Sequence, residues 1–539
     1  MYLLETSTVL MLLIGFYVVM FLMTLLIRKR KENVDGFMVS SSAVGFGFSA
    51  ASMTATWVWA ASFYAAASSG YKYGLSGALH YGLWGALMIL FIYPFGRRFR
   101  SVAPQARTLA EVMHARHGSV SQMTLAISNV LGSVISLTAN FTAAGALVAI
   151  LSPLSFTHGV LIAGFGVLAY TIWSGFRASV LTDFAQLVAM ILVAVVIIPV
   201  VFFKLGGPGL FDEGLLRLDA EQANFFSTKA ILEQGAPFFV AVLAYAIGNQ
   251  TIAQRLFAVR EDLIKRTFIM ATIGYGAIVI GLGMLGMLAL MAGLQPQGGD
   301  LNNIIPQMAS QYLPPLLIGA FFIMVIGSLS STADSDLSAL SAIVMTDIYG
   351  HNIARGKPNL RLMLWIGRLT MIGATMLGVI FASFKLDILS MLVFVGALWG
   401  AVVFPVIASF YWDRVTNKAF VSAVITGFVL FLIARFDLLP IVGAIAGFFE
   451  IVAAAGAGVV IGLMAFGFFG RRVGLTIGLL TALVMIPLMF GFMRDYPVLL
   501  ASLTAYGASA IVCIVVSLLG NERFDFDQIG DRVVAFQRQ

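Results

Sequence analysis

The sequence predicts an all-α polytopic membrane protein, and two observations predict that class. Of its 539 residues, 60% are hydrophobic and only 11% are charged, which is too little charge to cover the surface of a soluble protein of this length. Apolar windows of roughly 20 residues, the length that crosses about 30 Å of hydrocarbon, recur from one end of the chain to the other.

We expect fifteen of these windows to span the membrane. They lie near residues 8–27, 43–69, 76–99, 122–151, 156–173, 178–203, 232–255, 267–292, 314–345, 362–384, 388–412, 418–435, 440–469, 474–493 and 498–519. One set of alternating loops carries about three times as many Lys and Arg residues as the other, so the richer set is expected to be cytoplasmic. This places the N-terminus outside and the charged tail at 520–539 inside.

The same bias explains the net charge of +7 without a nucleic-acid partner. The first apolar run precedes its basic cluster, Arg28 to Lys31, which is the reverse of a cleaved signal peptide and indicates an anchor helix.

Cys513 is the only cysteine, which excludes an internal disulfide and a thiolate metal cluster. We find no Walker A pattern for ATP hydrolysis and no H-E-x-x-H metal motif, so an enzyme is not expected.

Two windows contain residues that favour an interrupted helix. The segment from Ser49 to Ser69 is crowded with Ala, Ser, Gly and Thr, and Gly248-Asn249-Gln250 interrupts the apolar run of the seventh window. A membrane helix tolerates a break only where the free backbone is buried in protein or lines a water-filled site. The two windows are five apart, the separation expected for a five-plus-five inverted repeat. For the Gly-Asn-Gln segment a simple kink or helix end stays an alternative.

Three carboxylates fall within the windows, although an ionisable group is costly in hydrocarbon. They are Asp183, Asp334 and Asp336, and no Lys or Arg is expected at comparable depth to neutralise them. Around Asp334, the hydroxyl residues Ser328, Ser331, Thr332 and Ser335 share one helical face. Such a stripe is typical of helix packing, but its oxygens, with carbonyls from a break near Ala55 to Val58, also suit Na⁺.

A small polar solute needs apolar walls and a few convergent polar groups. The candidates are Trp57, Trp59, His80, Tyr81, Tyr245 and Gln250. Helix packing or interfacial anchoring is the alternative for the tryptophans, and a structural role is the alternative for the histidine.

Several ordered motifs resemble the sodium:solute symporter family, which includes proline, sugar, pantothenate and sialic acid cotransporters. They are "SGFRASVLTDFAQ", the Asn249–Arg255 segment "NQTIAQR" and "SLSSTADSDLSALSAIVMTDIYG", and the similarity covers roughly residues 30 to 420. The segments "TWVWAASFYAAASSGYKYGLSG" and "APQARTLAEVMHARHG" look most like the active urea transporters within that family. Departures are Asn249-Gln250 in place of the usual Asp-Gln, and His80 where an aromatic residue is usual.

The resemblance implies a LeuT-type five-plus-five inverted repeat, with one extra N-terminal helix and about four extra C-terminal helices. The implied divisions are 1–36, an N-terminal helix and basic loop; 37–203, the first repeat; 204–230, an outer loop; 231–415, the second repeat; 416–519, the extra helices; and 520–539, the tail.

The resemblance also implies a set of ion ligands. A sodium site would take carbonyls of Ala55 and Val58 with the oxygens of Ser328, Ser331 and Thr332. Asp183 matches an aspartate near the sodium exit path, and Asp334 and Ser335 match a second site that would hold Na⁺ or a proton. Tyr245 matches a position at which the sugar cotransporters stack an aromatic ring on their substrate.

The expected function is therefore sodium-coupled symport of a small polar solute by alternating access in the plasma (bacterial inner) membrane. A urea-like solute is the first choice, and proline, pantothenate or a short carboxylate are alternatives. Proton coupling through Asp183, Asp334 or His80 is the alternative to sodium, and a membrane sensor on the same fold is the rival class. Membrane lipid is the expected surrounding, no organic cofactor is expected, and the oligomeric state stays open.

Overall fold

Long apolar segments fold as helices here because hydrocarbon offers the backbone no hydrogen-bond partners. The computed structural model describes residues 2–27, 33–40 and 44–538, and the predicted basic cluster Arg28–Lys31 lies outside these ranges. Within them, 13 helices are long and apolar enough to cross a membrane. The shorter α8 and the interrupted pair α3–α4 account for the two remaining predicted windows, so every one of the fifteen windows is helical.

The helices fall into two consecutive sets of five spans, and each set begins with an interrupted helix. The first set is α3 (Phe46–Trp57) with α4 (Ala60–Tyr73), α5 (Leu75–Val102), α7 (Ser119–Leu151), α8 (Phe156–Thr171) and α9 (Phe176–Lys204). The second is α12 (Ala236–Gly248) with α13 (Gln250–Ala258), α14 (Ile264–Met291), α16 (Pro315–Ile343), α17 (Leu360–Ala382) and α18 (Ile388–Tyr411). This is the five-plus-five arrangement that the sequence predicted.

One span precedes these sets and four follow them. They are α1 (Thr6–Ile27), α19 (Asn417–Phe436), α20 (Gly443–Phe469), α21 (Arg471–Met489) and α22 (Pro497–Leu519). Shorter helices lie in the connections: α2 (Val34–Val39), α6 (Leu109–His117), α10 (Leu210–Gly214) and α15 (Ile304–Tyr312). The short α11 (Thr228–Ala230) leads directly into the span of α12, and α23 (Gln528–Arg538) lies in the tail after α22.

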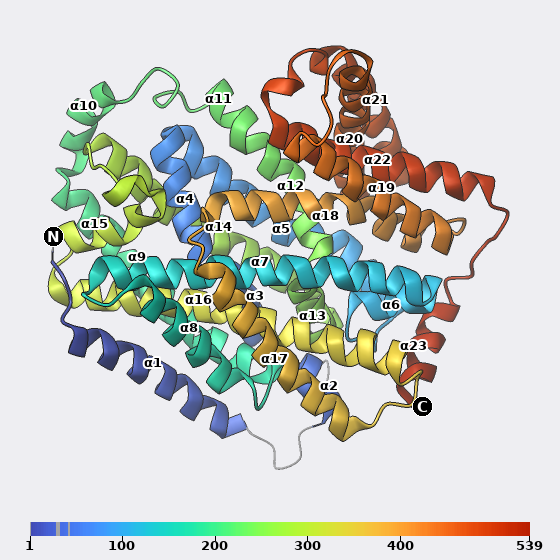
Figure 1. The fold of residues 1–539 in the computed structure, drawn as a ribbon, viewed down its shortest axis with the longest axis horizontal. Helices are drawn as coiled ribbons and strands as arrows, with labels where there is room; N and C mark the ends of the chain where they lie inside the picture. Colours follow the sequence, from blue (N-terminus) through green and yellow to red (C-terminus); the bar gives the residue numbers. More distant parts are fainter. Residues whose placement is uncertain (1, 28–32, 41–43, 539) are drawn as a thin grey trace.

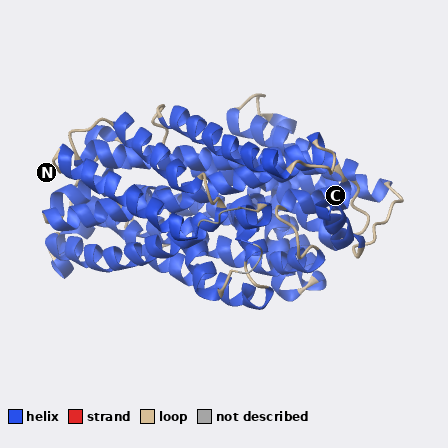
Figure 2. Cartoon of the chain, turned by 90° about the horizontal axis from the view of Figure 1, so that it is seen from below, coloured by secondary structure: helices blue, strands red, loops and turns tan. Residues whose placement is uncertain are grey.

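Many of the long helices, such as α7, α9 and α16, run along the longest axis of the molecule, while α1, α8 and α17 are inclined to it (Figure 1). The two chain ends lie toward opposite sides of the bundle (Figures 1 and 2). Helices α7 and α16 pass side by side through the middle of the bundle, while α20, α21 and α22 form a group at one edge (Figure 1). In the described part of the chain the β pairing is limited to an isolated bridge between Val44 and Val259.

Small residues allow α4 to pack directly against the backbone of α14. A Cβ atom added at Gly286 would lie 1.9 Å from the carbonyl oxygen of Ala67, and one added at Gly70 would lie 2.5 Å from the oxygen of Gly283. Close backbone approach of this kind replaces the hydrophobic driving force that lipid cannot supply between helices. The Ala- and Gly-rich composition of this segment therefore serves helix–helix contact inside the bundle, where α4 is almost entirely buried.

Candidate functional site

The first helix of the first repeat is interrupted in the middle of the bundle. Helix α3 ends at Trp57, where Val58 (φ −80°, ψ 57°) and Trp59 (φ −82°, ψ 157°) leave the helical conformation, and α4 begins at Ala60. The α3 backbone ladder ends with the bond from Val58 N to the oxygen of Thr54, at 2.8 Å. The carbonyl groups of the last turn are therefore left without helical partners, and the break predicted near Ala55 to Val58 is present.

The hydroxyl stripe of α16 faces this break. Ser328 Oγ donates a hydrogen bond to the carbonyl oxygen of Val58 at 2.5 Å, and Thr332 Oγ1 donates to that of Thr56 at 2.7 Å. Ser328 is completely buried and Thr332 is 4% exposed. Two segments that are about 270 residues apart in the chain are thus joined by hydrogen bonds between hydroxyl and carbonyl oxygens.

We call the carbonyl oxygens of Thr56 and Val58 and the hydroxyl oxygens of Ser328, Ser331 and Thr332 the oxygen cage. Thr56 was missed by the sequence analysis, which placed the second carbonyl at Ala55, in the same helical turn. Among the described residues, Ser328 and Thr332 of α16 donate to the carbonyls of Val58 and Thr56 and not to that of Ala55, whose role as a ligand stays a prediction. The five atoms of the cage are neutral oxygens, the donor set that suits a small hard cation of single charge.

A buried carboxylate lies directly beside the cage. Ser331 Oγ donates to Oδ1 of Asp183 at 2.5 Å, and Ser52 Oγ donates to Oδ2 at 2.5 Å. Asp183 lies in α9 and is completely buried. Because the Ser331 hydroxyl donates its hydrogen bond to the carboxylate, the lone pairs of its oxygen remain available to bind a cation.

The expectation that no Lys or Arg lies at the depth of these carboxylates is wrong. Nη2 of Arg255 lies 3.0 Å from Oδ2 of Asp183, and the two side chains are 4% and 0% exposed. The sequence analysis took Arg255 as the last residue of the seventh window, 232–255, and counted it with the charges of the following cytoplasmic loop. Instead, Asn249 only interrupts the span, with extended dihedrals of φ −97° and ψ 115°, and α13 continues as a buried helix.

The residues predicted for a second cation or proton site lie next to Arg255. The hydroxyl of Ser335 accepts a hydrogen bond from Nη2 of Arg255 at 2.6 Å. Asp334 is fully buried and accepts hydrogen bonds from the Tyr170 hydroxyl at 2.6 Å and from Thr182 at 3.3 Å. The position that a second cation would take beside Asp183 and Ser335 is thus occupied by a guanidinium in this structure.

Asp336 belongs to a different contact. Its Oδ2 accepts a hydrogen bond from Ser136 Oγ of α7 at 2.5 Å, and the side chain is 1% exposed. It therefore joins α16 to α7, away from the oxygen cage.

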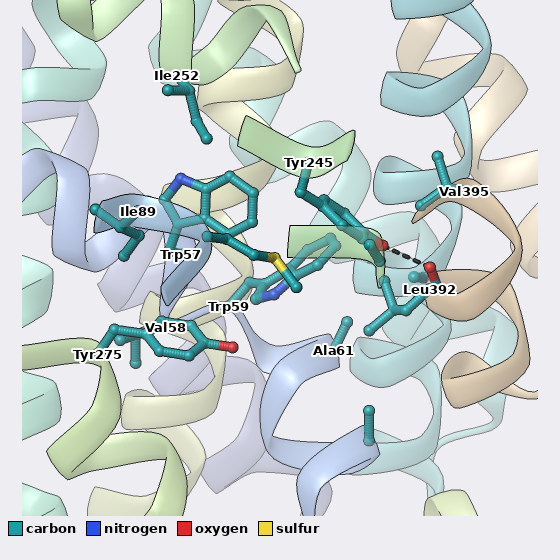
Figure 3. Close-up of a cluster of buried hydrophobic side chains, with 14 of the residues drawn as sticks. Trp57, Val58, Trp59, Ala61, Ile89, Tyr245, Ile252, Tyr275, Leu392 and Val395 are labelled. Atoms are coloured by element: carbon teal, nitrogen blue, oxygen red, sulfur yellow. Dashed lines mark hydrogen bonds between the residues drawn. The ribbon is translucent and has the colours of Figure 1, made fainter. Parts of the chain in front are cut away.

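A small aromatic cavity, with room for about one water molecule, lies beside the break (Figure 3). Four of the predicted solute-contacting residues line it, namely Trp57, Trp59, Tyr81 and Tyr245. The other lining residues were not predicted, and they are Met88, Phe238, Tyr275 and Leu392. Each of these is an apolar or aromatic residue in an apolar helix, so nothing in the sequence distinguishes it from a packing residue.

The side chains that line this cavity carry few polar atoms. The indole nitrogen of Trp57 is buried and has no hydrogen-bond partner. Ser62 Oγ links two hydroxyl groups, lying 3.3 Å from that of Tyr81 and 3.2 Å from that of Tyr275. The hydroxyl of Tyr245 donates to the carbonyl of Leu392 at 2.6 Å, so it holds α12 against α18 (Figure 3).

Two predicted residues, Gln250 and His80, do not line this cavity. Gln250 Nε2 donates to the carbonyl of Arg107 at 3.2 Å, and its Oε1 accepts from the backbone N–H of Leu109 at 3.2 Å. The break at Asn249 turns this side chain toward the start of α6 instead. His80 Nδ1 accepts from the Trp84 indole at 3.2 Å, one turn further along α5.

An all-helical bundle with two five-span sets, each opened by an interrupted helix, has the architecture of a secondary transporter. The match to known proteins makes this specific. The sodium:solute symporter family model matches residues 37–427, and the chain belongs to that family. It is thus an integral plasma-membrane transporter for a small-molecule solute, with sodium as the coupling ion, and not an enzyme.

Curated relatives share about a quarter of the aligned residues. The sodium/pantothenate symporter of Escherichia coli is 26% identical over 431 residues, covering 78% of this chain and 89% of that protein. The high-affinity proline transporter PutP of Bacillus subtilis is 24% identical, covering 77% and 88%. The probable urea active transporter 1 of Schizosaccharomyces pombe is 22% identical, covering 62% and 55%.

Among solved structures, a Na⁺-coupled sialic acid symporter in a substrate-bound outward-open state aligns with a TM-score of 0.66. The alignment covers 88% of this chain and 98% of that one at 17% sequence identity. At this identity the likeness establishes the shared fold.

Proposed function

We propose that this protein couples the inward movement of Na⁺ through the oxygen cage to the uptake of a small uncharged polar solute, with urea as the first candidate. The observation that carries the proposal is the meeting of the α3–α4 break with the α16 hydroxyls, directly beside the aromatic cavity. The loop charges support an outside N-terminus and a cytoplasmic C-terminus.

The break itself supports coupling between ion and solute. The carbonyl of Val58 belongs to the oxygen cage, whereas the side chains of its neighbours Trp57 and Trp59 line the cavity. An ion that fixes the carbonyl therefore also fixes the two indole rings. Because coupling is reciprocal, a solute that orders the rings must raise Na⁺ affinity by the same factor.

The cavity supports a small neutral solute. The cavity is far smaller than the roughly 300–1,000 Å³ pockets of drug-sized ligands, so it would have to widen even for urea. The lining residues include no acidic or basic side chain to pair with the carboxylate of a proline or pantothenate molecule. The unpartnered N–H of Trp57 suits a carbonyl oxygen such as that of urea, and the Tyr81 and Tyr275 hydroxyls can accept amide protons.

The ion gradient supplies enough energy for accumulation. Moving one charge inward across about 100 mV yields roughly 2.3 kcal/mol. At about 1.4 kcal/mol for each factor of ten, the potential alone supports roughly 50-fold accumulation of a neutral solute.

Purified protein in liposomes tests the proposal with labelled urea, proline and pantothenate and with Na⁺ and pH gradients imposed separately. We expect urea to accumulate under an inward Na⁺ gradient and not under a pH gradient alone. Equal uptake driven by a pH gradient in Na⁺-free buffer would reject sodium coupling in favour of proton coupling. Accumulation of proline or pantothenate without urea would reject the solute assignment and leave the ion site standing.

A further inference from the structure

Arg255 connects four separate elements beside the oxygen cage. Its Nη2 lies 3.0 Å from Asp183 Oδ2, 2.6 Å from Ser335 Oγ and 3.4 Å from Ser179 Oγ, and its Nε lies 3.0 Å from Ser52 Oγ. These partners come from α9, α16 and α3, while Arg255 itself lies in α13, the second half of an interrupted helix. The guanidinium also lies over a ring of α9, with its carbon 5.4 Å from the ring centroid of Phe176.

The carboxylate that Arg255 neutralises is the one that touches the oxygen cage. Asp183 Oδ2 faces the guanidinium, and Oδ1 accepts the proton of the cage hydroxyl Ser331 at 2.5 Å. An unpaired carboxylate buried in this environment would be strongly unfavourable. Arg255 therefore compensates the charge of Asp183 when the cage holds no ion.

A Na⁺ ion bound to Ser331 would lie beside the same carboxylate, next to a positive charge that is already present. Two cations that share one buried carboxylate repel each other more strongly than they would in water. Binding of Na⁺ and retention of the Arg255–Asp183 pair are therefore opposed.

We infer that Arg255 is a tethered counter-cation that competes with Na⁺ for Asp183, weakening ion binding and allowing the ion-free carrier to return across the membrane. This inference rests on the proposed Na⁺ site and deepens it. With Arg255 in place, the empty carrier has a compensated carboxylate at its centre. Without Arg255, the carboxylate keeps Na⁺ bound and the empty carrier returns slowly.

The test compares Arg255→Gln with wild type in two liposome assays of labelled solute. Solute exchange with Na⁺ and solute on both sides does not require the empty carrier to return, whereas net uptake does. We expect Arg255→Gln to lower the Na⁺ concentration for half-maximal exchange at least threefold, and to reduce net uptake about tenfold more than exchange. A merely structural role would reduce both rates together and would not tighten Na⁺ binding.

Two further variants sharpen the test. Arg260→Gln is the matched control, because this exposed arginine pairs only locally with Asp262 at 2.8 Å, and both assays should match wild type. The double variant Asp183→Asn/Arg255→Gln removes both charges, so the ratio of net uptake to exchange should return to within about threefold of wild type. If Arg255→Gln alone does not fold, the ratio of net uptake to exchange in the double variant tests the inference.

Three results would overturn the inference. The first is an unchanged or raised half-maximal Na⁺ concentration in Arg255→Gln. The second is an equal loss of exchange and net uptake in that variant. The third is a double variant whose ratio of net uptake to exchange stays far below that of wild type. A wild-type protein without any Na⁺ dependence would instead reject the proposed function, so the two failures are distinguishable.

Discussion

Replacing Thr332 by alanine removes one hydroxyl ligand from the oxygen cage. In the ion-free state the variant loses the hydrogen bond from Oγ1 to the Thr56 carbonyl, 2.7 Å long, which contributes about 1 kcal/mol to stability. In the ion-bound state it loses an oxygen contact to a full charge, about 1.5–3 kcal/mol. The difference of about 0.5–2 kcal/mol predicts a half-maximal Na⁺ concentration roughly 2- to 30-fold higher.

The assay is initial solute uptake into liposomes as a function of external Na⁺ at saturating solute. Thr332→Ser is the matched control, because it keeps the hydroxyl and should stay within about twofold of wild type. The maximal rate should change less than the Na⁺ dependence, since the cavity residues are untouched. A folded Thr332→Ala protein with an unchanged half-maximal Na⁺ concentration would remove this hydroxyl from the ion site and refute the reasoning.

Three further predictions concern the solute, the topology and the stability. Trp57→Phe removes the unpartnered indole N–H, so KM for urea should rise roughly 2- to 10-fold in uptake kinetics, and an unchanged KM would exclude this donor. In a Cys513→Ser background, a cysteine at Glu221 should react with an impermeant maleimide on intact cells and one at Arg523 should not; the opposite pattern would invert the topology. Burial lowers the pKa of His114 in α6 to about 4, below the ordinary value of about 6.5, so its contribution to stability is complete above pH 6.5 and is lost as the pH falls toward 4. Thermal unfolding of His114→Gln should therefore be less acid-sensitive than that of wild type, and equal sensitivity would contradict the assignment.

The helical architecture was predictable because hydrocarbon permits few solutions. Each apolar window had to become a helix with internal hydrogen bonds, so composition alone located the spans. The break at Val58 was also predictable, since a run of small residues that covers lipid poorly must be buried against other helices. The close approach of Gly286 in α14 to the backbone of Ala67 in α4 is the helix packing that these small residues allow.

The ion site was only partly predictable. The spacing of Ser328, Ser331 and Thr332 placed three hydroxyls on one face, and the structure brings two of them to free carbonyls. Which carbonyls lack helical partners depends on where the helix ends, so the sequence did not single out the carbonyl of Thr56. Arg255 was misplaced because it was taken as the end of the seventh window, whereas the helix after the Asn249 break stays buried in the bundle beyond that residue.

The solute cavity was the least predictable part. Trp57 and Trp59 were found because they flank the break, but Tyr275 and Phe238 carry no signal beyond apolar packing. Gln250 was chosen as a polar group in the membrane, and its amide instead holds the start of α6.

The most direct test of the central claim is equilibrium binding of radioactive sodium to the purified protein in the absence of solute. The account predicts saturable binding to wild type and at least a tenfold loss of affinity when Ser331 and Thr332 are both changed to alanine, with added solute tightening binding to wild type. Equal Na⁺ affinity in the folded double variant, or no saturable binding to wild type, would contradict the account.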